Sequence, residues 1–274
     1  RGNPMWLPWG EGGHAGPPLQ EEWITSRRNR ITPLFSLLGV SVTRAAMARK
    51  SRSQGRVAHP ATIRAFQRRL LAWYRRHGRD LPWRRTRDPY AILVSEVMLQ
   101  QTQVQRVLLY YEKFLHRYPT LEELASADEL AVRESWEGLG YYARARNLQR
   151  TTQQIVEEHA GRFPRQIEEL TALPGIGLYT AGAVISFAFH RPAAILDTNA
   201  ARVLTRFFAL PPERQTTGFL WSVARQVTPA NRAHHFNQAI MDLGATVCTA
   251  RAPRCPDCPV RRICRSLRQA EKAV

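Results

Sequence analysis

The chain contains 274 residues, 44% of them hydrophobic, and its 40 Lys and Arg against 22 Asp and Glu give a net charge of +18. This length and hydrophobic content suffice for a sizeable core in one or two domains. No run of 18 apolar residues occurs, so we expect no transmembrane helix and no membrane partner. The excess charge is almost all arginine. It favours a nucleic-acid partner because the guanidinium fork matches phosphate, although a GC-rich genome or a solvated surface gives the same composition.

Residues 1–60 differ in composition from the rest of the chain. Nine of the first twenty residues are Pro or Gly, and residues 27–56 are rich in Arg and Ser. We expect this segment to be disordered and to act as a weak electrostatic tether to DNA. The apolar stretch 31–42 lacks an initiating Met and a cleavage site, so it does not predict a signal peptide, and Met47 offers an alternative start.

From residue 61 onward the apolar residues recur at helical spacing. Phe66, Leu70 and Leu71 share one face of the first helix, with arginines on the other. Thr120 and Glu123 form the pattern of a capping box, which marks a helix start. Further helices are expected over residues 91–101, 102–118, 132–137, 143–159, 167–172, 179–189, 219–228 and 235–245. No stretch alternates as a strand does, so the sequence predicts an all-α fold.

Four cysteines, all within the last 27 residues, have the spacing C-x6-C-x2-C-x5-C: Cys248, Cys255, Cys258 and Cys264. This clustering favours a metal site over a disulfide framework, and with it an intracellular, reducing location in the cytoplasm or nucleoid. Four thiolates suit a [4Fe–4S] cluster or a tetrahedral zinc ion, and the spacing alone leaves the two open.

The segment 173–206 begins with Leu-Pro-Gly-Ile-Gly, in which Gly175 and Gly177 directly precede a helix-forming run. Glycines can take backbone angles that a side chain forbids, and N–H groups at a helix N-terminus suit a phosphate oxygen. A lone G-x-G is most often a plain turn. Here Asp197 follows at a fixed distance, after an apolar helix and an apolar lead-in.

Several stretches together resemble the MutY-type adenine DNA glycosylases of the helix-hairpin-helix, endonuclease III-like superfamily. They are the hairpin with its later Asp, residues 79–84 (RDLPWR), residues 95–104 (SEVMLQQTQV), residues 138–148 (GLGYYARARNL) and the cysteine spacing. The resemblance runs from about residue 66 to residue 265.

The resemblance implies a two-lobed, all-α helix-hairpin-helix fold. Residues 61–86 with 191–270 would form one lobe, which carries a [4Fe–4S] cluster on the four cysteines. Residues 87–190 would form the other lobe, a helical bundle with the hairpin at about 168–189. The catalytic cleft would lie between the lobes.

The resemblance also implies catalytic roles. Glu96 would protonate the adenine ring, and Asp197 would stabilise the positive charge that develops on the sugar. Tyr179 and Asn199 would help to position the reacting groups. Endonuclease III-like enzymes have a lysine at the place of Tyr179, whose amine forms a Schiff base and enables strand cleavage. Tyr179 therefore implies a monofunctional glycosylase.

Further residues would bind DNA and the flipped base. Tyr141 would be a wedge inserted into the base stack and Gln101 a second probe, offsetting the cost of base flipping. Gly175, Gly177 and Arg144 would contact the DNA. The adenine pocket would be lined by Arg79, Trp83 and Arg84, although Trp83 equally suits the core.

The function that follows is a base excision repair enzyme, acting as a monomer, that removes adenine opposite guanine or 8-oxoguanine in double-stranded DNA. The chain has Thr198 where the family commonly has glycine, and it ends ten residues after Cys264, before the family's Nudix-like domain. The second departure leaves the opposite-base preference open. Two alternatives remain: a thymine glycosylase for T·G mismatches on the same fold, and a non-catalytic DNA-binding iron–sulfur protein, against which the Glu96 and Asp197 pair argues.

Overall fold

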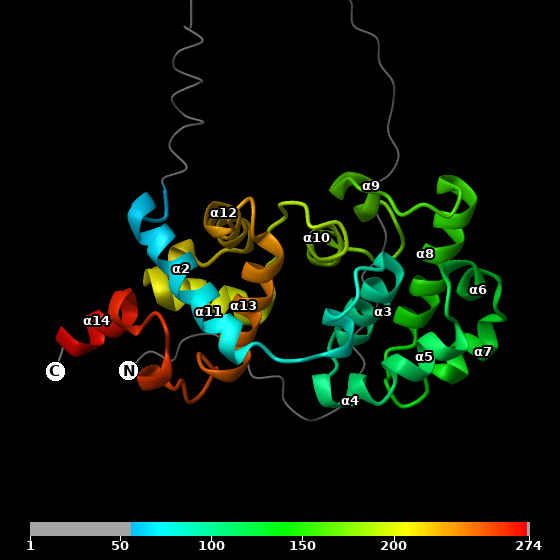
Figure 1. Cartoon of the computed structure of the whole chain (residues 1–274), viewed down its shortest axis with the longest axis horizontal. Coiled ribbons are helices and arrows are strands. Elements are labelled where there is room, and N and C mark those ends of the chain that lie inside the picture. The colour runs from blue at the N-terminus through cyan, green and yellow to red at the C-terminus, as the bar shows by residue number, and fades with distance from the viewer. Residues whose placement is uncertain (1–55, 273–274) are drawn as a thin grey trace, which may run out of the picture. The chain divides into compact units, whose positions relative to one another are not determined.

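Figure 1 shows the computed structural model of the chain, which describes residues 56–272. Every regular element in this range is helical, so the predicted all-α fold is confirmed there. None of the helices between residues 56 and 272 combines the length and apolarity that a membrane span requires. The segment expected to be disordered lies, up to residue 55, outside the described residues.

The helices differ from the prediction at three places. The expected helix 102–118 is two helices separated by a turn, and the helices at 198–208 and 265–272 were not predicted. The capping box at Thr120 and Glu123 is present, with both reciprocal hydrogen bonds. In chain order the helices are α2 (Pro60–His77), α3 (Pro89–Leu99), α4 (Val104–Leu108), α5 (Tyr111–Arg117), α6 (Leu121–Ser126), α7 (Glu129–Ser135), α8 (Ala143–His159), α9 (Ile167–Thr171), α10 (Leu178–Phe187), α11 (Thr198–Phe208), α12 (Thr217–Val227), α13 (Ala233–Thr246) and α14 (Arg265–Lys272).

Helices α3 and α10 pack against each other at the centre of the first hydrophobic cluster. Both are apolar on nearly every face, and all residues of α3 from Tyr90 to Met98 are buried, as expected for a helix surrounded by others. Asp88 caps α3 by accepting hydrogen bonds from two backbone N–H groups. A Cβ on Gly182 of α10 would lie 2.7 Å from the Ala194 carbonyl oxygen, so only glycine lets the 191–196 loop run this close.

A second hydrophobic cluster joins α2, α11, α12 and α13, where α2 lies beside α11 and α13 (Figure 1). Its centre is aromatic: the Phe66 ring lies 4.3 Å from that of Phe207 and 5.9 Å from that of Phe236. Leu81 and Ala193 pack into the first cluster, although the expected lobe boundaries place them with the second. The two clusters are therefore interleaved in sequence, and the division into lobes stays a prediction.

Candidate active site

Glu96 lies on α3 with only 4% of its surface exposed. Burial raises the pKa of its carboxyl to about 7; the Tyr179 hydroxyl and the charge of Arg84 oppose this rise, and Asp197 adds to it. Its Oε2 atom has no hydrogen-bond partner among the described residues. A carboxyl with such a pKa is still partly protonated at neutral pH and can act as a general acid.

A cavity of about 60 Å³ opens beside Glu96. Its wall contains Tyr179 and all three residues expected around the base, Arg79, Trp83 and Arg84, together with Gln238 and Met241. Trp83 is also a core residue, because it is buried and its ring packs edge-on against Tyr111 at 5.4 Å. The cavity thus brings the predicted acid and the predicted base-binding residues together.

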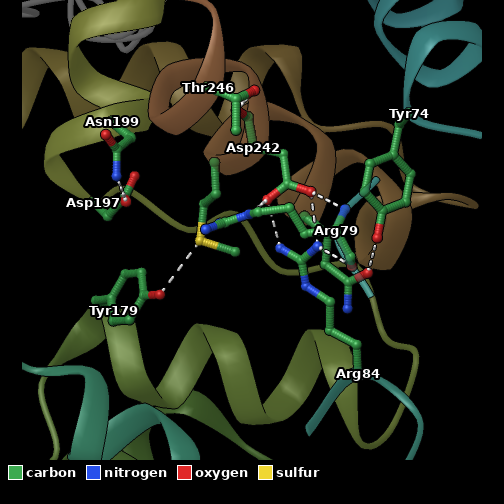
Figure 2. A network of polar contacts seen from close by, with 10 residues as sticks. Tyr74, Arg79, Arg84, Tyr179, Asp197, Asn199, Asp242 and Thr246 are labelled. Carbon is green, nitrogen blue, oxygen red and sulfur yellow. Dashed lines mark hydrogen bonds and ion pairs between the residues drawn. The ribbon is translucent and has the colours of Figure 1, made fainter. Parts of the chain in front are cut away.

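Asp242 of α13 fixes the two arginines of this wall (Figure 2). It is fully buried and accepts from the backbone N–H of Arg79 at 2.9 Å, from Arg79 Nε at 2.7 Å, and from both terminal nitrogens of Arg84 at 2.8 Å. Burial tends to raise the pKa of Asp242, but the Arg84 hydrogen bonds and charge outweigh it and hold the pKa below its ordinary value. Each carboxylate oxygen of Asp242 accepts one hydrogen bond from Arg79 and one from Arg84. These bonds hold both guanidinium groups in one orientation.

Tyr179 lies near the N-terminus of α10, on the cavity wall opposite α13. Its hydroxyl is 3.5 Å from Sδ of Met241 (Figure 2). Burial and the neighbouring Glu96 carboxyl raise its pKa well above 10, so the phenol keeps its proton. A neutral phenol can donate a hydrogen bond to the site, but it offers no amine for Schiff-base chemistry.

Asp197 caps the N-terminus of α11 and is partly exposed. Its Oδ1 accepts from the Ala200 N–H at 2.7 Å and its Oδ2 from Asn199 Nδ2 at 2.9 Å (Figure 2). Asn199 Oδ1 in turn accepts from Arg202 at 2.7 Å, and Arg202 Nε donates to the Cys248 carbonyl at 2.8 Å. A chain of hydrogen bonds therefore fixes the Asp197 carboxylate to the loop that carries the cysteines. Asp197 does not line the cavity beside Glu96.

Only one of the two glycines of the hairpin turn has a positive φ angle. Gly175 has φ +73°, and a Cβ there would lie 2.9 Å from the Asn147 side chain. Gly177 has φ −92°, and a Cβ added there would meet no atom within 4 Å, so neither its backbone nor its surroundings require glycine. Gly177 instead begins α10 as its N-cap, directly before the exposed Leu178.

The two residues expected to enter the base stack share a backbone feature. Gln101 has φ 55° and Tyr141 has φ 51°, the left-handed conformation that costs a non-glycine residue roughly 1–2 kcal/mol. Tyr141 is 63% exposed, although it is a large aromatic residue. Strained residues of this kind gather at functional sites, where the surrounding structure holds them in place.

Arg144 departs from its expected role as a DNA contact. Its side chain is buried, and its two terminal nitrogens donate to oxygen atoms of the protein. The guanidinium is thus bound within the protein, between the turn of Gln101 and the turn of Tyr141.

The four cysteines, Cys248, Cys255, Cys258 and Cys264, are free thiols that line one cavity of about 260 Å³. Arg206 lies at its edge and donates to the carbonyl oxygens of Thr249 and Ala250. Within residues 56–272, no three His, Cys, Asp or Glu side chains are gathered as a single bound metal ion requires.

Comparison with known proteins identifies the family. The model of the HhH-GPD superfamily of base excision DNA repair proteins matches residues 94–226. A thymine-DNA glycosylase from Aeropyrum pernix is 41% identical over 209 residues, which cover 74% of this chain and 94% of the relative. The chain belongs to the HhH-GPD superfamily.

Curated adenine DNA glycosylases of the superfamily are also similar to this chain. The human enzyme is 46% identical over 224 residues, 77% of this chain and 41% of the relative. One from Buchnera aphidicola (Baizongia pistaciae) is 40% identical over 207 residues, 75% of this chain and 59% of the relative. The chain thus spans about half the length of these relatives.

Solved structures agree on the HhH-GPD fold. A thermostable thymine-DNA glycosylase superimposes with a TM-score of 0.72 at 31% identity, over 76% of this chain and 98% of that one. A non-covalent endonuclease III–DNA complex gives a TM-score of 0.68 at 23% identity, over 78% and 99% of the two chains, which supports the fold alone.

Sequence reasoning missed Asp242, the partner that orders the pocket of this HhH-GPD protein. The residue lies on the apolar face of α13, where Phe236, Ala239 and Leu243 are also buried. A carboxylate at such a position predicts a buried partner, because an unpaired buried charge is too costly. A carboxylate on an apolar helix face, in a chain that also contains Arg79 and Arg84, could have predicted this buried ion pair.

Proposed function

We propose that this protein is a monofunctional adenine DNA glycosylase, which hydrolyses the N-glycosidic bond of adenine opposite guanine or 8-oxoguanine in double-stranded DNA. The observation that carries the proposal is Glu96, a buried acid with a pKa of about 7 on the wall of a cavity. A purine has ring nitrogens that such an acid can protonate. The 46% identity to the human adenine enzyme supports the same substrate.

In the proposed reaction, the arginine-rich surface and the hairpin bind the DNA backbone, and Gln101 and Tyr141 open the base stack. The adenine rotates into the cavity, where Glu96 donates its proton to a ring nitrogen. The bond between the base nitrogen and C1′ breaks, and its electron pair leaves with the base. Asp197 stabilises the cationic sugar until a water oxygen bonds to C1′, and the proton that this water releases restores Glu96. The products are free adenine and an abasic site.

Two neighbours of the acid assist in this scheme. Tyr179 keeps its phenol proton and lies with Glu96 on the wall of the cavity, and Asn199 donates a hydrogen bond to one oxygen of Asp197. The wall formed by Arg79, Arg84 and Asp242 gives the base a rigid surface. Without an amine at Tyr179, strand cleavage through a Schiff base does not follow.

We further propose that Cys248, Cys255, Cys258 and Cys264 hold a [4Fe–4S] cluster. Four free thiols on one cavity are the donor set of such a cluster. The group would supply a cross-link that fixes the loop and its arginines, and the reaction above involves no electron transfer. We place the enzyme in a reducing compartment, on the nucleoid DNA, because four cysteines without a disulfide are typical of such a compartment. We propose that it acts there as a monomer.

A specific observation favours a second candidate, a thymine glycosylase acting on T·G pairs. The Aeropyrum pernix relative that carries this name matches over 94% of its length. Thymine has no purine ring nitrogen to protonate, so this function would leave Glu96 without its proposed role.

One experiment separates the two candidates. The protein is incubated with duplexes that carry A·G, A·8-oxoguanine, T·G or only Watson–Crick pairs, and abasic sites are cleaved with alkali. If only the adenine-containing strand of the A·G or A·8-oxoguanine duplex is cleaved, the result supports the proposal. Cleavage at the thymine of T·G without adenine release overturns it in favour of the second candidate, and no cleavage of any duplex leaves a non-catalytic DNA-binding protein.

A further inference from the structure

The guanidinium of Arg144 joins residues 97–102 to residues 139–140, two segments that are far apart in the sequence. It donates to the last turn of α3, to the turn around Gln101 and to the turn before Tyr141. Its Nη1 donates to the carbonyl oxygens of Val97 at 3.0 Å, Met98 at 2.9 Å and Gln100, and its Nη2 to Thr102 Oγ1 at 3.0 Å, Leu139 O at 3.2 Å and Gly140 O at 3.0 Å.

These contacts lie on both sides of Gln101. The Gln100 carbonyl precedes the residue and the Thr102 hydroxyl follows it, and both accept from Arg144. Gln101 itself is exposed and has φ 55°. Its neighbours in the chain are therefore fixed while its side chain stays free to reach outward.

Tyr141 is held in a related way. The carbonyl oxygens of the two residues before it accept from Arg144, and the guanidinium carbon lies 5.5 Å from the centre of the Tyr141 ring. The loop is tightly wound, with φ 85° at Gly138, 72° at Gly140 and 51° at Tyr141. Glycine adopts such angles freely, whereas Tyr141 keeps its angle only where other groups hold it.

We propose that Arg144 is a positioning residue for base flipping, which holds the two base-stack probes, Gln101 and Tyr141, in their strained conformations at a fixed distance from the Glu96 helix. The proposal rests on the glycosylase function proposed above. Lysine cannot replace it, because one ammonium presents three donors at a point, whereas the planar guanidinium reaches acceptors on two separate turns. A phosphate contact is a poorer reading, since the side chain is buried and both terminal nitrogens are already bound.

The test uses Arg144→Lys in the full chain, with Arg150→Lys as the matched control, because Arg150 is an exposed arginine on the same helix α8. Single-turnover excision of adenine from an A·G duplex measures the reaction. 2-Aminopurine next to the mispaired adenine reports unstacking by its fluorescence, independently of bond cleavage. Fluorescence anisotropy gives the affinity for the same duplex.

We expect Arg144→Lys to bind the duplex within about threefold of wild type but to excise adenine roughly 10- to 100-fold more slowly, with little rise in 2-aminopurine fluorescence. In a Gln101→Ala, Tyr141→Ala background, the same substitution should cost less than about threefold, because its effect passes through the two missing side chains. Arg150→Lys should behave as wild type. Equal losses in both backgrounds would mean a general structural role and would overturn the proposal, as would wild-type unstacking by Arg144→Lys.

A second variant covers the case in which Arg144→Lys does not fold. Thr102→Val keeps the arginine and removes one of its two acceptors beside Gln101, so it should slow excision several-fold, and this loss should vanish when Gln101 is already alanine. If the loss persists in the Gln101→Ala background, the proposed positioning role of Arg144 is overturned. Absence of adenine excision by the wild-type protein would instead refute the proposed function, so the two failures are distinguishable.

Discussion

The raised pKa of Glu96 makes a prediction in which activity and stability change in opposite directions. The perturbation is Glu96→Gln, which keeps the shape of the side chain and removes its ionisation. The pKa rises from 4.5 to about 7 in the folded protein, which corresponds to a cost of about 3 kcal/mol for ionising the buried carboxyl. A glutamine at position 96 does not ionise, so the folded variant does not have this free-energy cost.

The sign follows from the order in which the two states lose the proton. Below pH 4.5 the carboxyl is protonated in the folded and the unfolded chain, and Glu96 makes no difference to the pH dependence. Between 4.5 and about 7 the unfolded chain ionises first, so folding becomes progressively less favourable. Above pH 7 the full penalty is present. Glu96→Gln should therefore stabilise the protein by about 3 kcal/mol at pH 8 relative to its effect at pH 4.

Thermal unfolding at a series of pH values measures this effect. For a folded region of this size, about 3 kcal/mol corresponds to a shift of roughly 6–12 °C in Tm. Glu112→Gln is the matched control, because Glu112 is exposed on α5 and its substitution should leave Tm nearly unchanged. A Glu96→Gln protein that gains no stability between pH 4 and pH 8 would refute the argument from burial.

The same variant should lose adenine excision by about 10² or more, since the amide cannot donate the proton. In the wild type, the single-turnover rate should fall about tenfold per pH unit above pH 7, where Glu96 is ionised. Excision by Glu96→Gln at the wild-type rate would contradict the adenine assignment and favour the thymine substrate.

Three further predictions concern the other site residues. Asp197→Asn should lose excision by about 10² or more in single-turnover assays while keeping its affinity for A·G duplex in anisotropy measurements, because the DNA-contacting surface is unchanged. Wild type should leave abasic sites uncut and should not be trapped on DNA by borohydride, whereas Tyr179→Lys should gain trapping, since it introduces an amine; efficient trapping of wild type would show that another amine forms the Schiff base. Purified wild type should absorb broadly near roughly 400 nm with about four irons per chain, and Cys258→Ser should lose both; a colourless protein with one zinc ion would refute the cluster.

Much of the site followed from local sequence patterns. Glu96 stood out because its neighbours Val97 and Met98 are apolar, and a carboxyl between such residues is buried with them. Tyr179 was informative through its place two residues after the hairpin turn. These inferences use contacts along one helix or one turn, which a sequence displays directly.

The contacts between residues far apart in the sequence could not be predicted from local patterns. Arg144 donates to carbonyl oxygens far earlier in the chain, such as that of Met98, and no residue pattern near Arg144 predicts those acceptors. Helix α11 was not predicted, although Asp197 caps it. Patterns of residue types predict the buried faces and the capping residues of single helices. The partner of a buried charge depends on which helix faces pack together, and a local pattern does not show this.

The arginines that bind groups within the protein change how the net charge of +18 is interpreted. Arg84 is bound to Asp242, Arg144 to backbone oxygens, and Arg202 to Asn199 and the cysteine loop. Each fixes a functional segment inside the protein, so the charge available to DNA is smaller than the composition suggests. Counterion release depends only on the arginines that neutralise phosphates, each of which contributes about 0.9 to the slope of log K against log salt. Replacing an exposed arginine at the DNA surface should lower that slope, whereas Arg144→Lys should leave the slope unchanged and alter the excision rate.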